Sequence, residues 1–176
     1  METFDQPREL TASPHFQADR QVALTTLENA RIDAPIRGLI ANLASISCCF
    51  TLQSCYGHFV HGEQPHPENL EPLPAHDVGA VRYRIAYIAL CFDNSPPGRR
   101  LLTALADIPA IDRDLIHFGS PSWFWERYLN SYALQVEPSR FINKDEAVID
   151  YGEALHVQQV RALFFEGLEQ LIGDFL

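Results

Sequence analysis

One stretch, residues 33–61, constrains the fold more than any other part of the chain. Asp33 precedes Pro35, which is tolerated in a first helical turn because the N–H that proline lacks would have no helical partner there. Apolar side chains then recur at spacings of three and four residues, at Ile36, Leu39, Ile40, Leu43 and Ile46. This spacing predicts a helix with Asp33 as its N-cap and with one buried face.

A short apolar run, residues 48–52, follows this helix and is too short and too rich in β-formers to continue it, so a strand is predicted. The Ser-Cys-Tyr-Gly-His segment, residues 54–58, should lie at the end of that strand. Strand ends and loops on a rigid scaffold are common places for binding and catalysis. Within this segment, Gly57 predicts a positive φ or a close backbone approach, and its neighbouring N–H groups could bind an anion.

These two segments resemble the N-terminal signature of the tRNA wybutosine-synthesising protein 3 family, whose members are 4-demethylwyosine methyltransferase-like. In that family a capped helix leads to a strand and a Ser-Ser-Cys-Ser-Gly-Arg motif. Ser54, Cys55 and Gly57 match the motif, whereas His58 stands where the family has arginine. A second block, Tyr-Ala-Leu-Gln-Val-Glu-Pro, resembles the family's Phe-Lys-Phe-Glu-Pro strand end and places Glu137 on its glutamate.

The resemblance implies a shared fold and an S-adenosylmethionine-dependent methyltransferase that acts on a modified nucleoside of tRNA. It also implies that both motif blocks meet in one cleft. The cofactor-binding residues would then be Ser54, Cys55, Gly57, His58 and Glu137. This chain lacks the histidine that the family carries on an intervening strand, where it reads Cys-Phe-Asp-Asn.

Hydrophobic periodicity places further elements along the chain. A first helix should begin at Asp19 and bury Val22, Ala23, Leu27 and Ala30. Strands are predicted at residues 80–92, 115–120 and 131–138, and helices at 99–108 and 152–175, the last with Val157, Val160, Leu163, Phe164, Leu168 and Leu171 inward. Residues 121–128 fit a helix or a strand equally well.

Helices and strands interleave without a regular βαβ pattern, and no Gly-x-Gly-x-x-Gly follows a strand. We therefore predict an α+β (irregular α/β) fold, with a mixed β-sheet flanked by helices, rather than a standard Rossmann fold. Residues 1–176 should form one domain with an irregular arm at residues 1–18. Residues 62–79 hold four prolines and two glycines, which predicts an irregular flap bordering the site.

Charge and cysteine content limit the partners and the compartment. A net charge of −10 makes the averaged surface repel polyanions, which argues against non-specific nucleic-acid binding. No apolar run approaches the length of a membrane span, and no leader pattern is present, so no membrane partner is expected. Four cysteines without a Cys-x-x-Cys pair favour reduced thiols in the cytoplasm.

The side chains with chemical capability leave several roles open. Cys55 could be a nucleophile activated by His58 or His61. The same three residues are candidate metal ligands. Their spacing matches no standard zinc module, so zinc is not expected. Candidate catalytic residues are thus Cys55, His58 and Glu137. An aromatic group could stack on a nucleobase, and it comprises Trp123, Phe124, Trp125, Tyr128 and Tyr132.

Three functions remain open from the sequence. The first is the methyltransferase, with S-adenosylmethionine as cofactor and tRNA or a modified nucleoside as partner. The second is a nucleotide- or cofactor-binding module for a small-molecule ligand. The third is a Cys/His metal-binding protein.

Overall fold

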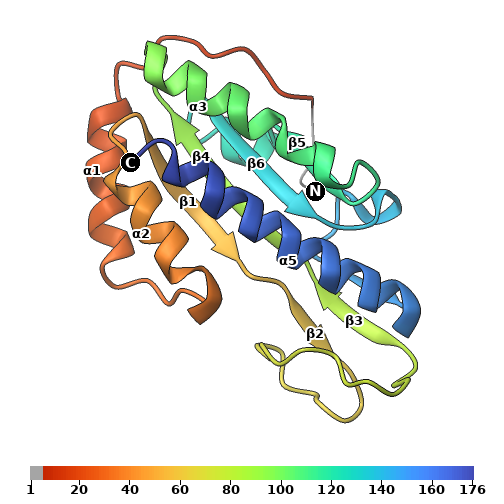
Figure 1. The fold of residues 1–176 in the computed structure, drawn as a ribbon. Helices are drawn as coiled ribbons and strands as arrows, with labels where there is room; N and C mark the ends of the chain where they lie inside the picture. The colour runs from red at the N-terminus through yellow and green to blue at the C-terminus, as the bar shows by residue number, and fades with distance from the viewer. Residues whose placement is uncertain (1–5) are drawn as a thin grey trace.

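The computed structural model describes residues 6–176, which form two antiparallel sheets flanked by helices (Figure 1). The helices are α1 (Phe16–Leu27), η1 (Ala34–Ile36), α2 (Arg37–Ser45), α3 (Pro96–Ala106), η2 (Ile108–Ile111), α4 (Ser122–Trp125), η3 (Ser139–Phe141) and α5 (Tyr151–Gly173). The strands are β1 (Cys49–Cys55), β2 (His58–Val60), β3 (Val81–Arg84), β4 (Ala86–Phe92), β5 (Ile116–Gly119), β6 (Ser131–Val136) and β7 (Glu146–Ile149). The predicted α+β class is confirmed, but the strands pair antiparallel in two sheets instead of forming one mixed sheet.

The strand order is β1-β4-β6-β5 in the larger sheet and β2-β3-β7 in the smaller one. The chain passes between the sheets through Tyr56 and Gly57, which join β1 to β2, and again at Ile85, which joins β3 to β4. Figure 1 shows the smaller sheet continuing beyond one end of the larger one, with α5 running along both. The segment singled out by the sequence therefore lies at the junction of the two sheets.

The prediction of one strand over residues 80–92 is wrong, because that segment is divided between the two sheets at Ile85. The backbone at this break is satisfied by a side chain. Ala86 N–H donates to the hydroxyl oxygen of Tyr83 at 2.9 Å, and that hydroxyl donates to the carbonyl oxygen of Val136 at 2.8 Å. Since buried backbone groups must be paired, the Tyr83 hydroxyl allows the chain to leave one sheet for the other.

Gly57 makes the crossing from β1 to β2 possible. Its φ is +89°, and a Cβ placed on it would lie 2.9 Å from the Cβ of Ala86. The carbonyl oxygen of Gly57 accepts a hydrogen bond of 2.7 Å from the buried Arg161 guanidinium. Both reasons that the sequence suggested for a glycine, a positive φ and a close approach, are thus present at this position.

The core confirms the predicted helical stripe. Ile36, Leu39, Ile40, Leu43 and Ile46 are all buried, the last of them just beyond α2. Helices α2, α3 and α5 pack on the face of the larger sheet that carries its main core, whereas α1 and α4 contact the other face. Asp33, however, makes no side-chain cap to the helix that follows it.

Several predicted elements differ in extent. Helix α1 begins at Phe16, which packs on Phe50 with ring centroids 5.4 Å apart, so the irregular arm ends earlier than expected. Val22, which was predicted to lie on the buried face of this helix, is 64% exposed, so that prediction is wrong. Ala30 lies beyond the end of the helix. In α5 the predicted inward residue Leu163 is 44% exposed. Residues 121–128 resolve to the short helix α4.

The Pro-rich flap has the predicted character. Residues 62–79 contain neither helix nor strand, and within them Leu73 N–H donates to the Gln158 side chain of α5 at 2.7 Å. The arm is also anchored, because Thr11 N–H donates to the Asn130 side chain at 2.9 Å.

Among the helices in residues 6–176, none combines the length and the apolar character that a bilayer crossing requires.

Candidate functional site

A cleft of about 960 Å³ opens where the two sheets meet. It lies against the face of β6 that carries Ala133 and Gln135, while the alternating residues Leu134 and Val136 belong to the main core. Its volume is within the range of about 300–1,000 Å³ that is usual for small-molecule sites. The lining residues are Arg31, Asp33, Gln53, Ser54, Cys55, His58, Pro67, Glu68, Arg82, Arg84, Ile85, Tyr87, Pro121, Trp123, Phe124, Ala133, Gln135, Asp145 and Glu146.

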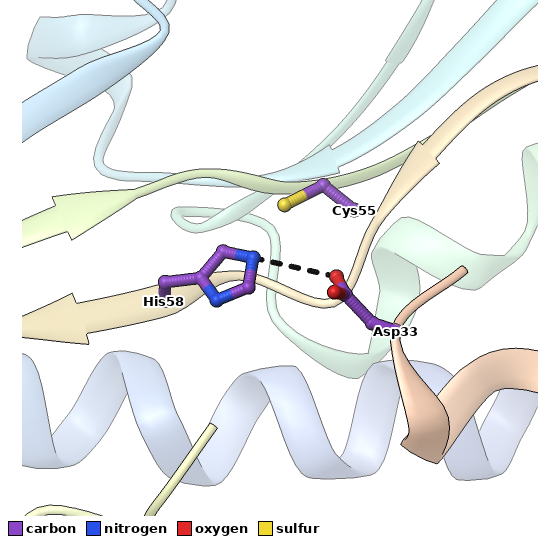
Figure 2. Close-up of side chains that lie close together, drawn as sticks. All are labelled: Asp33, Cys55 and His58. Atoms are coloured by element: carbon purple, nitrogen blue, oxygen red, sulfur yellow. Dashed lines mark ion pairs between the residues drawn. The ribbon is translucent and has the colours of Figure 1, made fainter. Parts of the chain in front are cut away.

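Three of these residues form an Asp-Cys-His cluster, namely Asp33, Cys55 and His58. One side-chain ligand atom from each lies within 4.8 Å of the others. Figure 2 shows the three side chains pointing toward one another from the residue before η1, the end of β1 and the start of β2. His58 Nε2 lies 3.3 Å from Asp33 Oδ2.

Backbone groups hold the members of the cluster. The N–H of Tyr56 donates to Asp33 Oδ2 at 2.8 Å, and the N–H of Gly57 lies 3.4 Å from Cys55 Sγ as a donor. His58 Nδ1 lies 3.1 Å from the carbonyl oxygen of Asn69 in the flap. The crossing between β1 and β2 therefore contacts Asp33 and Cys55, and the flap orients His58.

The electrostatics of the cluster favour a charged pair. Hydrogen bonding to Asp33, and secondarily to Cys55, raises the pKa of His58 to about 10 although burial opposes this. The hydrogen bond with His58 is in turn the main reason that the pKa of Asp33 is lowered. With acceptors facing both ring nitrogens, His58 is an imidazolium at neutral pH when nothing else binds there.

The structure brings together only part of the expected cofactor set. Ser54, Cys55 and His58 line the cleft. Gly57 is buried, and both its N–H and its carbonyl are engaged, so it does not form the exposed anion-binding nest that we expected. Glu137 is completely buried and is absent from the lining, so its expected place in the cleft is wrong.

Glu137 has a structural setting at the end of β6. Its N–H donates to the Leu115 carbonyl at 2.8 Å, and its own carbonyl oxygen lies 2.9 Å from His117 Nε2. Its carboxylate accepts a hydrogen bond from Gln135, whose side chain is the one that lines the cleft. Gln135 thus lies between the glutamate and the cleft.

The aromatic group is also divided. Trp123 and Phe124 line the cleft, and Trp123 is 40% exposed, with the Arg127 guanidinium 4.0 Å from its ring centroid. The remaining members pack elsewhere: Tyr128 on Phe50, and Trp125 against Tyr132.

The other histidines near the motif do not join the cluster. His61 is buried at a bridge to Gln64, and His66 Nδ1 accepts from the N–H of Glu68 at 3.2 Å. His76 pairs with Glu63 at the surface at 3.0 Å. The candidate metal set of Cys55, His58 and His61 is therefore corrected to one in which Asp33 replaces His61.

Asp33 is one site residue that sequence reasoning missed. A helix-capping aspartate and a site aspartate look alike before a proline-containing first turn, so no sequence signal separated the two roles. Asn69 was missed for a different reason, because it lies in the flap, where no periodicity relates it to His58.

Comparisons with known proteins inform the fold and not the site. No protein-family model matches the chain, and no curated protein matches it. Two structures of the PH1069 protein from Pyrococcus horikoshii are similar to this chain, and each has a TM-score of 0.51 and covers 92% of it. The first is 16% identical and is itself covered to 96%, and the second is 13% identical and is covered to 93%. A hypothetical protein from Aeropyrum pernix gives a TM-score of 0.42 at 14% identity over 81% of this chain and 96% of its own. At such identities, the likeness to the PH1069 protein shows a shared fold alone.

Proposed function

We propose that this protein is an S-adenosylmethionine-dependent methyltransferase-like enzyme related to those of tRNA wybutosine synthesis, and that the cleft binds its methyl donor. One observation carries the proposal. Ser54 and Cys55, which match the family motif, line the same cleft as the exposed ring of Trp123. A motif and a stacking surface that are far apart in the sequence thus share one ligand-sized space.

The charges of the lining favour a zwitterionic ligand over a polyphosphate. Four cationic side chains line the cleft, the His58 imidazolium and three arginines, Arg31, Arg82 and Arg84, together with four acidic residues, Asp33, Glu68, Asp145 and Glu146. A nucleoside triphosphate needs an excess of positive charge, which this lining lacks. S-adenosylmethionine carries one carboxylate, one ammonium and one sulfonium group, so it can use both signs of charge.

The aromatic end of the cleft suits the base of such a ligand. Trp123 is 40% exposed, with the Arg127 guanidinium over its ring at 4.0 Å from the centroid, and stacking of a base on an aromatic side chain contributes roughly 1–3 kcal/mol. An arginine such as Arg82, which is exposed at the cleft, can pair with a carboxylate. The substrate would be a modified nucleoside, free or within tRNA, bound beside the methyl donor.

The test is a calorimetric titration with S-adenosylmethionine, S-adenosylhomocysteine, AMP and ATP. We expect the two adenosyl ligands to bind and ATP to bind more weakly. Trp123→Ala should weaken S-adenosylmethionine binding about 5- to 140-fold, because a stacking energy of roughly 1–3 kcal/mol is divided by 1.4 kcal/mol per tenfold. Arg82→Ala should also weaken it, whereas the control Arg99→Ala, an exposed arginine outside the lining, should not.

Absence of adenosyl-ligand binding, or equal affinities in Trp123→Ala and the wild type, would refute the proposal. Methyl transfer is then measured with tRNA or its modified nucleoside and a methyl-labelled donor. Salt-sensitive binding of tRNA would support the tRNA-linked form of the substrate, because phosphate contacts weaken as salt rises.

A second candidate function rests on the position of Glu137. The resemblance implies that both motif blocks meet in the cleft, but Glu137 does not line it. This departure favours a nucleotide- or cofactor-binding module that uses the same cleft without methyl transfer. Tight binding of AMP or ATP in the titration above, with weak binding of the adenosyl ligands, would select it.

A further inference from the structure

We propose that Asp33, Cys55 and His58 bind a divalent zinc-class metal ion, with its fourth coordination position open to the cleft. The inference does not depend on methyl transfer or on the family resemblance. It rests on the geometry of the three side chains, on their chemistry, and on the groups that orient them.

The geometry is near that of a tetrahedral site. Zinc binds sulfur at about 2.3 Å and nitrogen or oxygen at about 2.0–2.2 Å, so its ligand atoms lie about 3.3–3.7 Å from one another. In the cluster, Asp33 Oδ2 and His58 Nε2 are 3.3 Å apart, and all three ligand atoms lie within 4.8 Å. The Asp33–His58 pair already has such a separation, and rotation about the Cα–Cβ bond of Cys55 would bring its sulfur into coordination.

The ligand types select the metal class. A thiolate, an imidazole nitrogen and a carboxylate oxygen form a borderline-soft set, which suits zinc and disfavours calcium or magnesium. Three protein ligands with one open position are the arrangement of catalytic zinc sites, whereas structural sites use four. Within the described part of the chain, this is the one group of three such residues that converges.

The imidazole of His58 is oriented as a metal ligand requires. Its Nδ1 lies 3.1 Å from the carbonyl oxygen of Asn69, which leaves Nε2 facing Asp33 and Cys55. Metal-binding histidines almost always donate their second N–H to such a carbonyl or to a carboxylate. Asn69 is itself fixed, because its side chain donates to the Phe59 carbonyl at 3.0 Å and accepts from the Glu71 N–H at 3.0 Å.

The other two ligands also have outer partners. Asp33 accepts from the N–H of Tyr56, and Cys55 Sγ faces the N–H of Gly57. Such backbone donors hold anionic ligands in place without neutralising them. All three side chains line the cleft, so a bound ion would meet any ligand there. Its chemical role would be that of a Lewis acid toward an oxygen, nitrogen or sulfur atom of that ligand.

Zinc binding is tested on the chelator-treated full chain by titration with zinc chloride in competition with a chromophoric chelator. We expect one equivalent to bind. Asp33→Asn, Cys55→Ser and His58→Gln should each lower the affinity by about 100-fold or more, since loss of outer partners alone costs 10- to 100-fold. The controls Glu63→Gln and His76→Ala remove a similar histidine–carboxylate pair at the surface and should leave the affinity unchanged.

Cobalt substitution identifies the sulfur ligand. The wild type loaded with cobalt chloride should show a thiolate-to-metal charge-transfer band in the near ultraviolet, and Cys55→Ser should lose it. Zinc should also protect Cys55 from alkylation in the unmodified wild-type protein. Cys48, Cys49 and Cys91 are buried and serve as internal references, so this measurement stands even if a variant fails to fold.

Failure of the wild type to bind zinc, equal affinity in the cluster and control variants, or unchanged alkylation of Cys55 would each overturn the inference. The cluster would then be a metal-free imidazolium–carboxylate pair. Zinc binding without adenosyl-ligand binding would support this inference while refuting the methyl-donor proposal, so the two can fail separately.

Discussion

Replacement of Gly57 by alanine should destabilise the protein through two separate effects. A side chain at a φ of +89° is strained by roughly 1–2 kcal/mol. The added Cβ would also lie 2.9 Å from Ala86 Cβ and 3.1 Å from Ala86 N, within the crossing between the sheets. Overpacking against atoms that cannot move aside costs a further 1–3 kcal/mol or so, which gives a total of roughly 2–5 kcal/mol.

Two other glycines separate these effects. Gly79 has a φ of +75°, but a Cβ added there would have no neighbour within 4 Å, so Gly79→Ala should show the strain alone. Gly62 has neither a positive φ nor a close neighbour, so Gly62→Ala should change stability by less than about 0.5 kcal/mol. The difference between Gly57→Ala and Gly79→Ala then measures the steric contribution of the Ala86 contact.

The assay is urea unfolding of the wild type and the three variants, followed by circular dichroism and fitted for the free energy of unfolding. The expected order of destabilisation is Gly57→Ala, then Gly79→Ala, then Gly62→Ala. Equal losses for Gly57→Ala and Gly79→Ala would mean that the crossing relaxes freely around the new methyl group. That result would refute the close packing of the two strand connections.

Three further predictions use the same assay. Leu39→Ala empties a buried position of α2 and should cost roughly 2–5 kcal/mol, so a loss below about 0.5 kcal/mol would contradict the inward face. Tyr83→Phe leaves the Ala86 N–H and the Val136 carbonyl without the hydroxyl that pairs them and should cost about 1–3 kcal/mol. The control Tyr87→Phe removes a hydroxyl that contacts a side chain, that of Gln53, and should cost less. The hydrogen bond with Asp33 is the main reason that the pKa of His58 is raised, so protonated His58 should stabilise the metal-free protein. This contribution to the free energy of unfolding should be complete below about pH 6.5 and lost as the pH rises to about 10. The same pH dependence of stability in a His58→Gln variant would contradict this.

The buried helical face was predictable because its physical cause is local. Ile36, Leu39 and Ile40 repeat at the helical period, and burial of that face follows from the period itself. The class of the fold followed from the same kind of pattern. Strands β2 and β7 were missed because each is only three or four residues long, so neither carries a clear alternation.

The break at Ile85 could not be read from the sequence. Val81, Tyr83 and Ile85 are all buried, so the alternation runs through the break as it would through a continuous strand. What divides the strand is a tertiary interaction, the hydroxyl of Tyr83 taking the place of a sheet partner for Ala86. Alternation reports which face is buried and carries no information about which sheet buries it.

The part of the site that could be predicted is the part that is local in sequence. Ser54, Cys55 and His58 are close in sequence, so their proximity in the cleft follows from one short crossing. The resemblance implies that Glu137 lies there too, yet the chain after β6 continues into a buried connection, where the Glu137 N–H donates to the Leu115 carbonyl oxygen. Which strand ends share a cleft depends on the order of strands in the sheet, which no local pattern specifies.

The Gly57 crossing links the stability of the fold to the geometry of the site. Cys55 and His58 flank Gly57, and their side chains reach the same point only because the chain turns sharply between β1 and β2. A methyl group at Gly57 must push the crossing away from Ala86, and this changes the separation of Cys55 Sγ and His58 Nε2. Metal binding tolerates little such change, so Gly57→Ala should weaken zinc binding even where the variant is still folded. Gly79→Ala, which is strained but remote from the cluster, should lose stability and keep its zinc affinity; equal zinc affinities in the two variants would show that the crossing does not set the ligand geometry.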